Sequence, residues 1–218
     1  MAVLTWDGPG QKKFETGVDR GVLYLPDETG AYTKGYAWNG LTSVSESPSG
    51  AEANKSYADN IVYMTLLSAE EMAATVEAYT YPDEFAICDG SYEAADGVFV
   101  GQQPRQPFGM AYRTKVGDDL KGTESGFKIH LIYNAFAAPS EKAYSSVNDS
   151  PEAATFSWEL STTPVSVDAN RSTALITIDS TKATKAKMDA FLAILWGTAS
   201  IEPKLPKPSE VISAFAGA

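Results

Sequence analysis

Several segments of the chain place apolar residues at every second position, and this pattern restricts the fold more than any other feature of the sequence. Successive side chains of a β-strand point to opposite faces of the sheet, so each such segment is predicted to be a strand with one face on a core. The alternating apolar residues are Met72, Ala74, Val76 and Ala78; Phe127, Ile129, Leu131 and Tyr133; Phe156, Trp158 and Leu160; and Ala174, Ile176 and Ile178. Four such strands imply a sheet-based core.

Turn-rich pieces such as PDETG, SPSG and VGDD separate further candidate strands. We expect these strands at residues 21–25, 32–44, 58–67 and 108–115. Many strands divided by turn signals favour a mainly β fold, a sandwich or a barrel.

One helix is predicted at about residues 181–196, with Ser180 or Thr181 as its N-cap and Gly197 as its stop. Its apolar stripe would pack on the sheet. Three cations, Lys182, Lys185 and Lys187, lie near its N-terminus, where the positive end of the helix dipole disfavours them. They are interpreted either as partners for acidic groups on a neighbouring subunit or as solvated surface lysines.

The last segment, residues 201–218, is predicted to be an extended, proline-containing C-terminal arm, because its three closely spaced prolines exclude a helix or a central strand there. Its end, from Val211 to Phe215, is apolar enough to dock on another surface. Residues 1–200 are expected to form a single domain, since 218 residues suit one well-filled core.

Charge and composition exclude several functional classes. The net charge of −11 disfavours proteins that grip nucleic acid, because that chemistry needs clustered Lys and Arg. No stretch of about 20 apolar residues predicts a membrane span, and residues 1–14 lack the pattern of a signal peptide, so we expect synthesis in a cytoplasm and no contact with a membrane. Residues 1–181 hold 12 basic and 25 acidic residues, whereas residues 182–218 hold 5 and 3. This asymmetry is compatible with head-to-tail contact between copies.

Residues typical of catalysis are scarce. The single histidine, His130, has no nucleophile motif near it, and the single cysteine, Cys88, lies in an apolar context that predicts burial. Carboxylates at Asp83, Asp89 and Asp118 have acidic neighbours that offer oxygen ligands for calcium, but turns and caps explain them better. We therefore predict that the chain is not an enzyme and has no catalytic, cofactor-binding or metal-binding residue.

The sequence closely resembles a family of major tail proteins, the tail tube subunits of long non-contractile-tailed bacteriophages. The resemblance covers almost the whole chain. It is carried by AWNGL, SPSGAE, YADN, EAYTYPDEF and CDGS within residues 36–91, and by FGMAYRT, FKIHLIYNA, SPEAATFSWELSTTPV and ITIDST further on.

This resemblance implies a tail tube β-sandwich flanked by a helix, of which six copies form a hexamer through a shared inner β-barrel. Stacked rings would form the tube of a virion, assembled in the host bacterial cytoplasm, and serve as a negatively charged conduit for genome ejection. The implied partners are further copies of the chain, a tape-measure protein inside the tube, and tail terminator and tail-tip proteins. DNA would pass through without specific binding.

Exposed sheet edges give such a subunit a means of assembly, because pairing edges between copies satisfies backbone groups and closes a ring. The polar loop at residues 46–55 is interpreted as a contact loop, with a mobile surface hairpin as the alternative. The predicted subunit contacts are Glu46, Pro48, Gly50, Glu52, Lys55, Lys182, Lys185, Lys187, Val211 and Phe215. A receptor-binding or carbohydrate-binding β-sandwich module, or a protein that caps the tube, is the alternative function.

Overall fold

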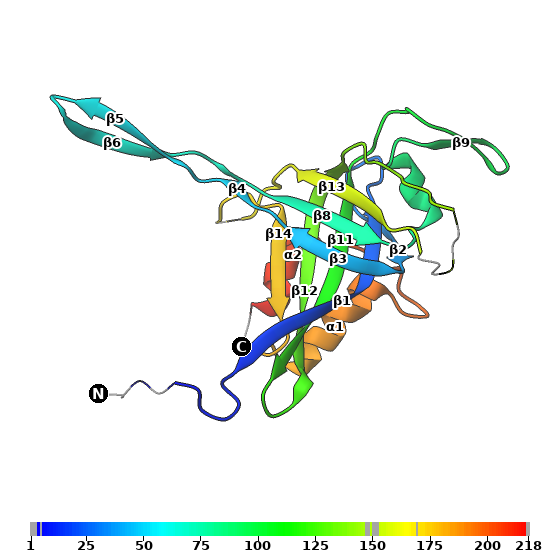
Figure 1. The fold of residues 1–218 in the computed structure, drawn as a ribbon. Helices are drawn as coiled ribbons and strands as arrows, with labels where there is room; N and C mark the ends of the chain where they lie inside the picture. Colours follow the sequence, from blue (N-terminus) through cyan, green and yellow to red (C-terminus); the bar gives the residue numbers. More distant parts are fainter. Residues whose placement is uncertain (1–3, 5, 147–148, 150–152, 169, 217–218) are drawn as a thin grey trace.

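The computed structural model describes residues 4, 6–146, 149, 153–168 and 170–216, and within them the chain is mainly β (Figure 1). The elements in the main sheet are β1 (Lys13–Leu25), β2 (Lys34–Trp38), β3 (Leu41–Glu46), β8 (Ala73–Ala78), β11 (Phe108–Asp118), β12 (Gly122–Ala137), β13 (Phe156–Thr162) and β14 (Leu175–Asp179). The remaining elements are β4 (Ser49–Gly50), β5 (Ala53–Ala58), β6 (Ile61–Leu67), β7 (Glu70–Glu71), η1 (Asp83–Ile87), β9 (Tyr92–Ala95), β10 (Val98–Val100), α1 (Lys185–Trp196) and α2 (Pro208–Phe215).

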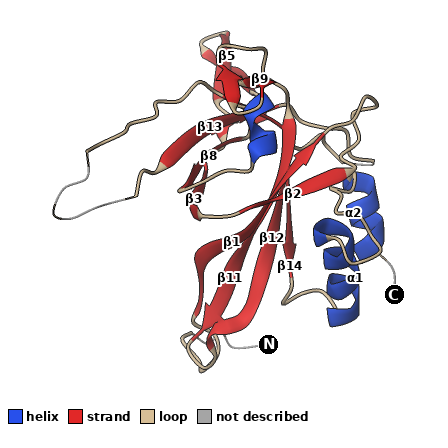
Figure 2. Ribbon diagram, turned by 90° about the vertical axis from the view of Figure 1, so that its right-hand side faces the viewer, coloured by secondary structure: helices blue, strands red, loops and turns tan. Residues whose placement is uncertain are grey.

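The main sheet is antiparallel, with the strand order β2-β1-β11-β12-β13-β8-β3. The long strand β12 lies at its branch point: residues 128–132 pair with β14, and residues 135–137 pair with β13. Beyond this point the sheet turns over, so that β13, β8 and β3 lie across one face of β1, β11 and β12. Helices α1 and α2 lie on the other face (Figure 2). The predicted mainly β fold with a flanking C-terminal helix is confirmed.

One hydrophobic core lies between the two halves of the sheet. At its centre Trp158 is fully buried, with its ring centroid 5.5 Å from that of Trp38 and 5.3 Å from that of Phe85. The predicted alternation of β8 is confirmed, because Ala74, Val76 and Ala78 are all buried in this core.

A second core lies between the sheet and the helices. The predicted shared face of β12 is confirmed here: Ile129, Leu131 and Tyr133 are buried against the helix layer, whereas Ile132 faces the first core. Their partners on α1 are the apolar residues Met188, Phe191 and Leu195. The two faces of β12 therefore contact different cores.

Helix α1 begins later than the sequence predicts. Its N-cap is Thr184, whose side chain accepts a hydrogen bond from the Lys187 amide, so Ser180 and Thr181 were wrong as caps. Both are used in other bonds: the Ser180 hydroxyl accepts from the Phe127 amide, and Thr181 donates to the Asp179 carboxylate. The end at Trp196 and the stop at Gly197, which has φ 75°, are as predicted.

The C-terminal segment is extended from residue 201 to residue 207, where Leu205 pairs with Tyr32 on the body. It then forms α2, a helix that was not predicted from the sequence; α2 begins at Pro208, a position where proline costs no hydrogen bond. Among the described residues, no helix is both long and apolar enough to cross a membrane.

Candidate assembly surfaces

The residues between β3 and β8 form a long hairpin, here called the arm (residues 49–71), which projects far from the body (Figure 1). Its root is the short β4–β7 ladder and its shaft is the β5–β6 ladder. At the tip, Asp59 and Asn60 have φ values of 51° and 62°, the positive values required by a two-residue type I′ turn. The arm is therefore a tight hairpin, and its β5–β6 ladder shifts register once, between the pairs Tyr57–Val62 and Ser56–Met64.

The arm exposes apolar side chains along its whole shaft. Every residue of β6 is exposed, and the exposed fractions reach 67% at Tyr63 and 71% at Leu67. Tyr57 and Ile61 near the tip are exposed in the same way. A two-stranded hairpin is only marginally stable alone in water, and a contiguous apolar surface of this kind marks an interaction site. The arm is thus suited to burial against another molecule.

A hydrogen-bonded network anchors the strand that leads into the arm. Glu46, the last residue of β3, accepts a hydrogen bond from the Tyr112 hydroxyl at 2.5 Å and lies 3.0 Å from Nδ1 of His130. The His130 ring stacks on Tyr112 with a centroid distance of 4.7 Å, and its Nε2 lies 3.0 Å from the Thr114 hydroxyl. Burial lowers the pKa of His130, against the opposing effect of Glu46. The network joins β3 to β11 and β12.

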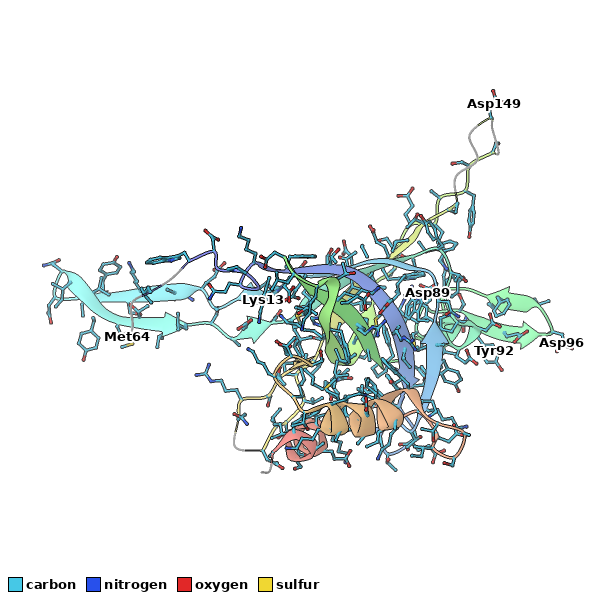
Figure 3. All side chains as sticks on the ribbon, turned by 90° about the horizontal axis from the view of Figure 1, so that it is seen from below. Lys13, Met64, Asp89, Tyr92, Asp96 and Asp149 are labelled. Atoms are coloured by element: carbon cyan, nitrogen blue, oxygen red, sulfur yellow. The ribbon has the colours of Figure 1, made fainter. Side chains whose placement is uncertain are left out.

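A second hairpin, β9–β10, leaves the body at a different place (Figure 3). Its exposed apolar residues are Tyr92, Val98, Phe99 and Val100. The Glu93 carboxylate accepts a hydrogen bond from the Gly97 amide at 2.9 Å, which fixes the turn.

A buried carboxylate holds the base of this second hairpin. Asp89 is 8% exposed and accepts from the Lys142 ammonium at 2.5 Å, with the Arg105 guanidinium 3.5 Å away. Arg105 also donates to the carbonyl of Ala137. These contacts of Asp89 connect the segment after η1, the segment before β11 and the segment after β12, and they fix the base of the hairpin.

The outward face of β3, β8 and β13 carries short polar and acidic side chains. The register places Ser43, Glu77 and Ser157 in one row across the three strands. A second row contains Ser45, Thr75 and Glu159. The face contains no Lys or Arg in these rows, and its two charges are both negative. These rows form an acidic sheet surface.

Charge is segregated along the chain. Residues 35–104, which run from β2 through the arm to the β9–β10 hairpin, contain 11 carboxylates and one base, Lys55. The remainder contains 17 carboxylates and 16 bases. Almost all of the net charge of −11 therefore belongs to one part of the molecule.

Five of the predicted contact residues lie at the start of the arm or within it. Glu46 ends β3, Pro48 precedes the arm, Gly50 belongs to β4, Glu52 follows it and Lys55 lies on β5. Gly50 has φ 87°, and a Cβ atom there would lie 2.2 Å from the Ala69 carbonyl oxygen, so the root requires glycine. The predicted contact loop is one side of a hairpin.

The other predicted contacts lie in the helix layer. Lys185 pairs with Asp189 at 2.7 Å, Lys187 donates to the Phe215 carbonyl at 3.1 Å, and Lys182 is exposed before α1. On α2, Val211 is buried in the second core, and the Phe215 ring lies 5.3 Å from that of Phe191. The apolar end of the chain thus docks on its own α1.

Neither the length of the arm nor the β9–β10 hairpin was predicted from the sequence. A signal was present in each case: β6 is a continuous apolar run, IVYMTLL, and the β9–β10 turn is an Asp-Gly pair between two short apolar segments. Neither pattern distinguishes a strand buried in its own chain from one buried by a partner.

The described residues offer no evident catalytic or metal centre. They contain no group of three or more His, Cys, Asp or Glu side chains arranged to hold a metal ion. Cys88 is fully buried, and burial raises its pKa to about 12, so its thiol is protonated at neutral pH. Asp118 accepts hydrogen bonds from the amides of Leu120 and Lys121 and thereby closes the β11–β12 turn.

No protein-family model matches this chain, and no curated protein matches it. Among solved structures, it is similar to a chain of the sheath–tube complex of an extracellular contractile injection system, with 14% identity over 73% of this chain and 88% of that one and a TM-score of 0.34. It is also similar to a chain of the anti-feeding prophage baseplate, with 10% identity over 75% and 95% and a TM-score of 0.37. A third similarity is to the tube-terminating cap of the anti-feeding prophage, with 12% identity over 83% and 97% and a TM-score of 0.34.

Proposed function

We propose that the chain is a structural virion protein that self-assembles into stacked, hexameric rings and so forms the tail tube through which a phage genome leaves. The observation that carries the proposal is the arm, a long hairpin with an exposed apolar shaft on a well-packed body. Burying its side chains against a neighbouring copy would remove apolar surface from water at about 25 cal/mol per Å². The motifs that resemble tail tube subunits point to the same function.

The acidic face of β3, β8 and β13 is the proposed wall of the channel. Its serine, threonine and glutamate side chains are short, and in the two rows described above the only charges are those of Glu77 and Glu159. Like charge disfavours phosphate contacts, so DNA would slide along such a wall. A tape-measure protein inside the tube and terminator and tail-tip proteins at its ends are the proposed partners. No catalytic role is proposed.

Deletion of the arm tests the proposal. Residues 49–71 would be replaced by a two-residue Asn-Gly turn between Pro48 and Met72, and the protein examined by negative-stain electron microscopy over a concentration series. We expect the unmodified chain to form hollow tubes or rings and the armless variant to remain monomeric. Circular dichroism provides the control, because both cores lie outside the arm and the variant should stay folded.

The same images separate the alternatives. Only monomers of the unmodified chain under all conditions would contradict the proposal, and glycan binding by those monomers would indicate a carbohydrate-binding module instead. Rings that never stack would indicate a protein that caps the tube.

A further inference from the structure

A groove of about 490 Å³ lies where the β11–β12 turn meets the start of α1. Phe127 and Met188 contribute its apolar lining, and Lys115, Lys185, Glu124 and Asp189 are among its charged residues. Arg113 also lines it, fixed by two 2.7 Å bonds to Asp19, with its guanidinium 5.5 Å above the Phe127 ring. Two of its three cations are already paired, Arg113 with Asp19 and Lys185 with Asp189, so the groove combines apolar surface with one further cation, Lys115.

The β9–β10 hairpin has the complementary character. Tyr92 and Phe99 are 60% and 55% exposed, and the hairpin carries Glu93 and Asp96 without any Lys or Arg. It belongs to the acidic part of the chain, residues 35–104. Both of its strands pair only with each other among the described residues, so its outer edges are open to a partner.

The two features lie at opposite ends of the molecule. In Figures 1 and 2 the β9–β10 hairpin lies at the top, whereas the β11–β12 turn and the start of α1 lie at the bottom. A contact between opposite ends of identical copies does not close on itself, and therefore it propagates as a filament. A partly apolar groove that contains Lys115 and an apolar, acidic hairpin at the two ends provide such a contact.

We propose that the groove of one copy receives the β9–β10 hairpin of a second copy, so that this pair forms the stacking contact between successive rings. The inference rests on the proposed function and goes further by assigning the two surfaces that meet along the tube. Aromatic side chains of the hairpin would cover Phe127, and its carboxylates would lie near Lys115. The arm would then make the contacts between copies within one ring.

Disulfide cross-linking between two single-site variants tests this contact directly. Ala95→Cys places a thiol on the hairpin, and Thr123→Cys places one on the groove; both positions are exposed. The natural Cys88 is fully buried and does not interfere. The matched control is Ala199→Cys, an exposed position after the far end of α1. The variants are mixed at equal concentration, oxidised, and assayed for the mixed dimer on non-reducing gels.

We expect the hairpin variant to cross-link to Thr123→Cys about a hundredfold faster than to Ala199→Cys, since docking raises the effective concentration of the two thiols. Adding Lys115→Glu to the groove variant should slow the reaction about fivefold, the effect of losing one partly exposed ion pair. Equal rates with the two partners would overturn the inference, whatever assemblies form.

Electron microscopy of the unmodified protein reports on the proposed function separately. Tubes without the specific cross-link would leave the tube proposal standing and reject this contact. The specific cross-link without tubes would support the contact and reject the tube.

Discussion

At the scale of single residues, several polar groups inside the body are matched to partners on neighbouring strands, although the buried Nε1 of Trp158 has no hydrogen-bond partner among the described residues. His130 shows this best, because its two ring nitrogens face Glu46 on one side and Thr114 on the other, and its ring lies flat on Tyr112. Its partners were not predictable, because they come from β3 and β11, which are remote in the sequence.

The pH dependence of stability should report on His130. Burial lowers the pKa of His130 from its ordinary value of 6.5, so the folded protein favours the neutral ring. The stability that depends on the neutral ring is present above pH 6.5, and it is lost as the pH falls through 6.5 towards the lowered pKa. The surrounding charges act in both directions: Glu46 and Glu15 raise the pKa, and Lys128 lowers it.

We expect the free energy of unfolding to decrease between pH 7.5 and pH 5, and to decrease less in the His130→Gln variant. Chemical denaturation at both pH values measures this, with the armless variant as a background that excludes effects of assembly. An equal decrease in both proteins would show that other groups control the pH dependence.

At the scale of elements, the strands were the most predictable part. Burial on one face leaves a period of two in the sequence, and β8 and β13 follow it, whereas residues 129–133 of β12 are buried on both faces. The start of α1 was not predictable, because Ser180 and Thr181 are good caps in isolation and only the fold shows that their hydroxyls bond to Phe127 and Asp179. The arm was not predicted for a related reason: its apolar run is equally typical of a strand buried in its own chain.

The attachment of the helix layer to the sheet depends on buried tyrosines. Tyr24 on β1 is fully buried and donates a 2.6 Å hydrogen bond to the carbonyl of Leu195 at the end of α1. Tyr133 on β12 donates in the same way to the carbonyl of Pro206 before α2. Both hydroxyls bridge the second core and fix the position of the helices.

Removal of one hydroxyl should therefore destabilise the body. Tyr24→Phe leaves the Leu195 carbonyl without this donor, and we expect a loss of about 1–2 kcal/mol in the free energy of unfolding. Urea denaturation measures it. Tyr63→Phe, at an exposed position on the arm, is the matched control and should change the stability of the monomer very little. Equal effects of the two substitutions would contradict the role assigned to Tyr24.

At the scale of the whole molecule, charge and apolar surface are distributed unequally between its parts. The acidic part contains the arm, the β9–β10 hairpin and two of the three strands that form the proposed channel wall, whereas the helix layer and the β11–β12 turn belong to the nearly neutral remainder. A molecule with different ends is suited to head-to-tail assembly. Charge counts alone do not reveal this arrangement, because it depends on which strands lie together.

The channel wall can be tested by reversing its charge. The double variant Glu77→Lys, Glu159→Lys converts two carboxylates of the proposed wall to ammonium groups, and it should still assemble because these side chains point away from both cores. We expect tubes of the variant to retain a short DNA duplex on sedimentation, and the retention to fall steeply with added salt as phosphate contacts release counterions.

The matched control for this variant places lysine at Glu202, an exposed carboxylate beside the helix layer. In tubes of the double variant, the channel wall would surround the duplex with lysines from every copy. In Glu202→Lys tubes the lysines would lie on the outside and contact the duplex one at a time, so these tubes should retain far less DNA. Equal retention by the two kinds of tube would place the acidic face of β3, β8 and β13 outside the channel. Failure of the double variant to assemble, with its fold intact, would instead make that face a contact between copies.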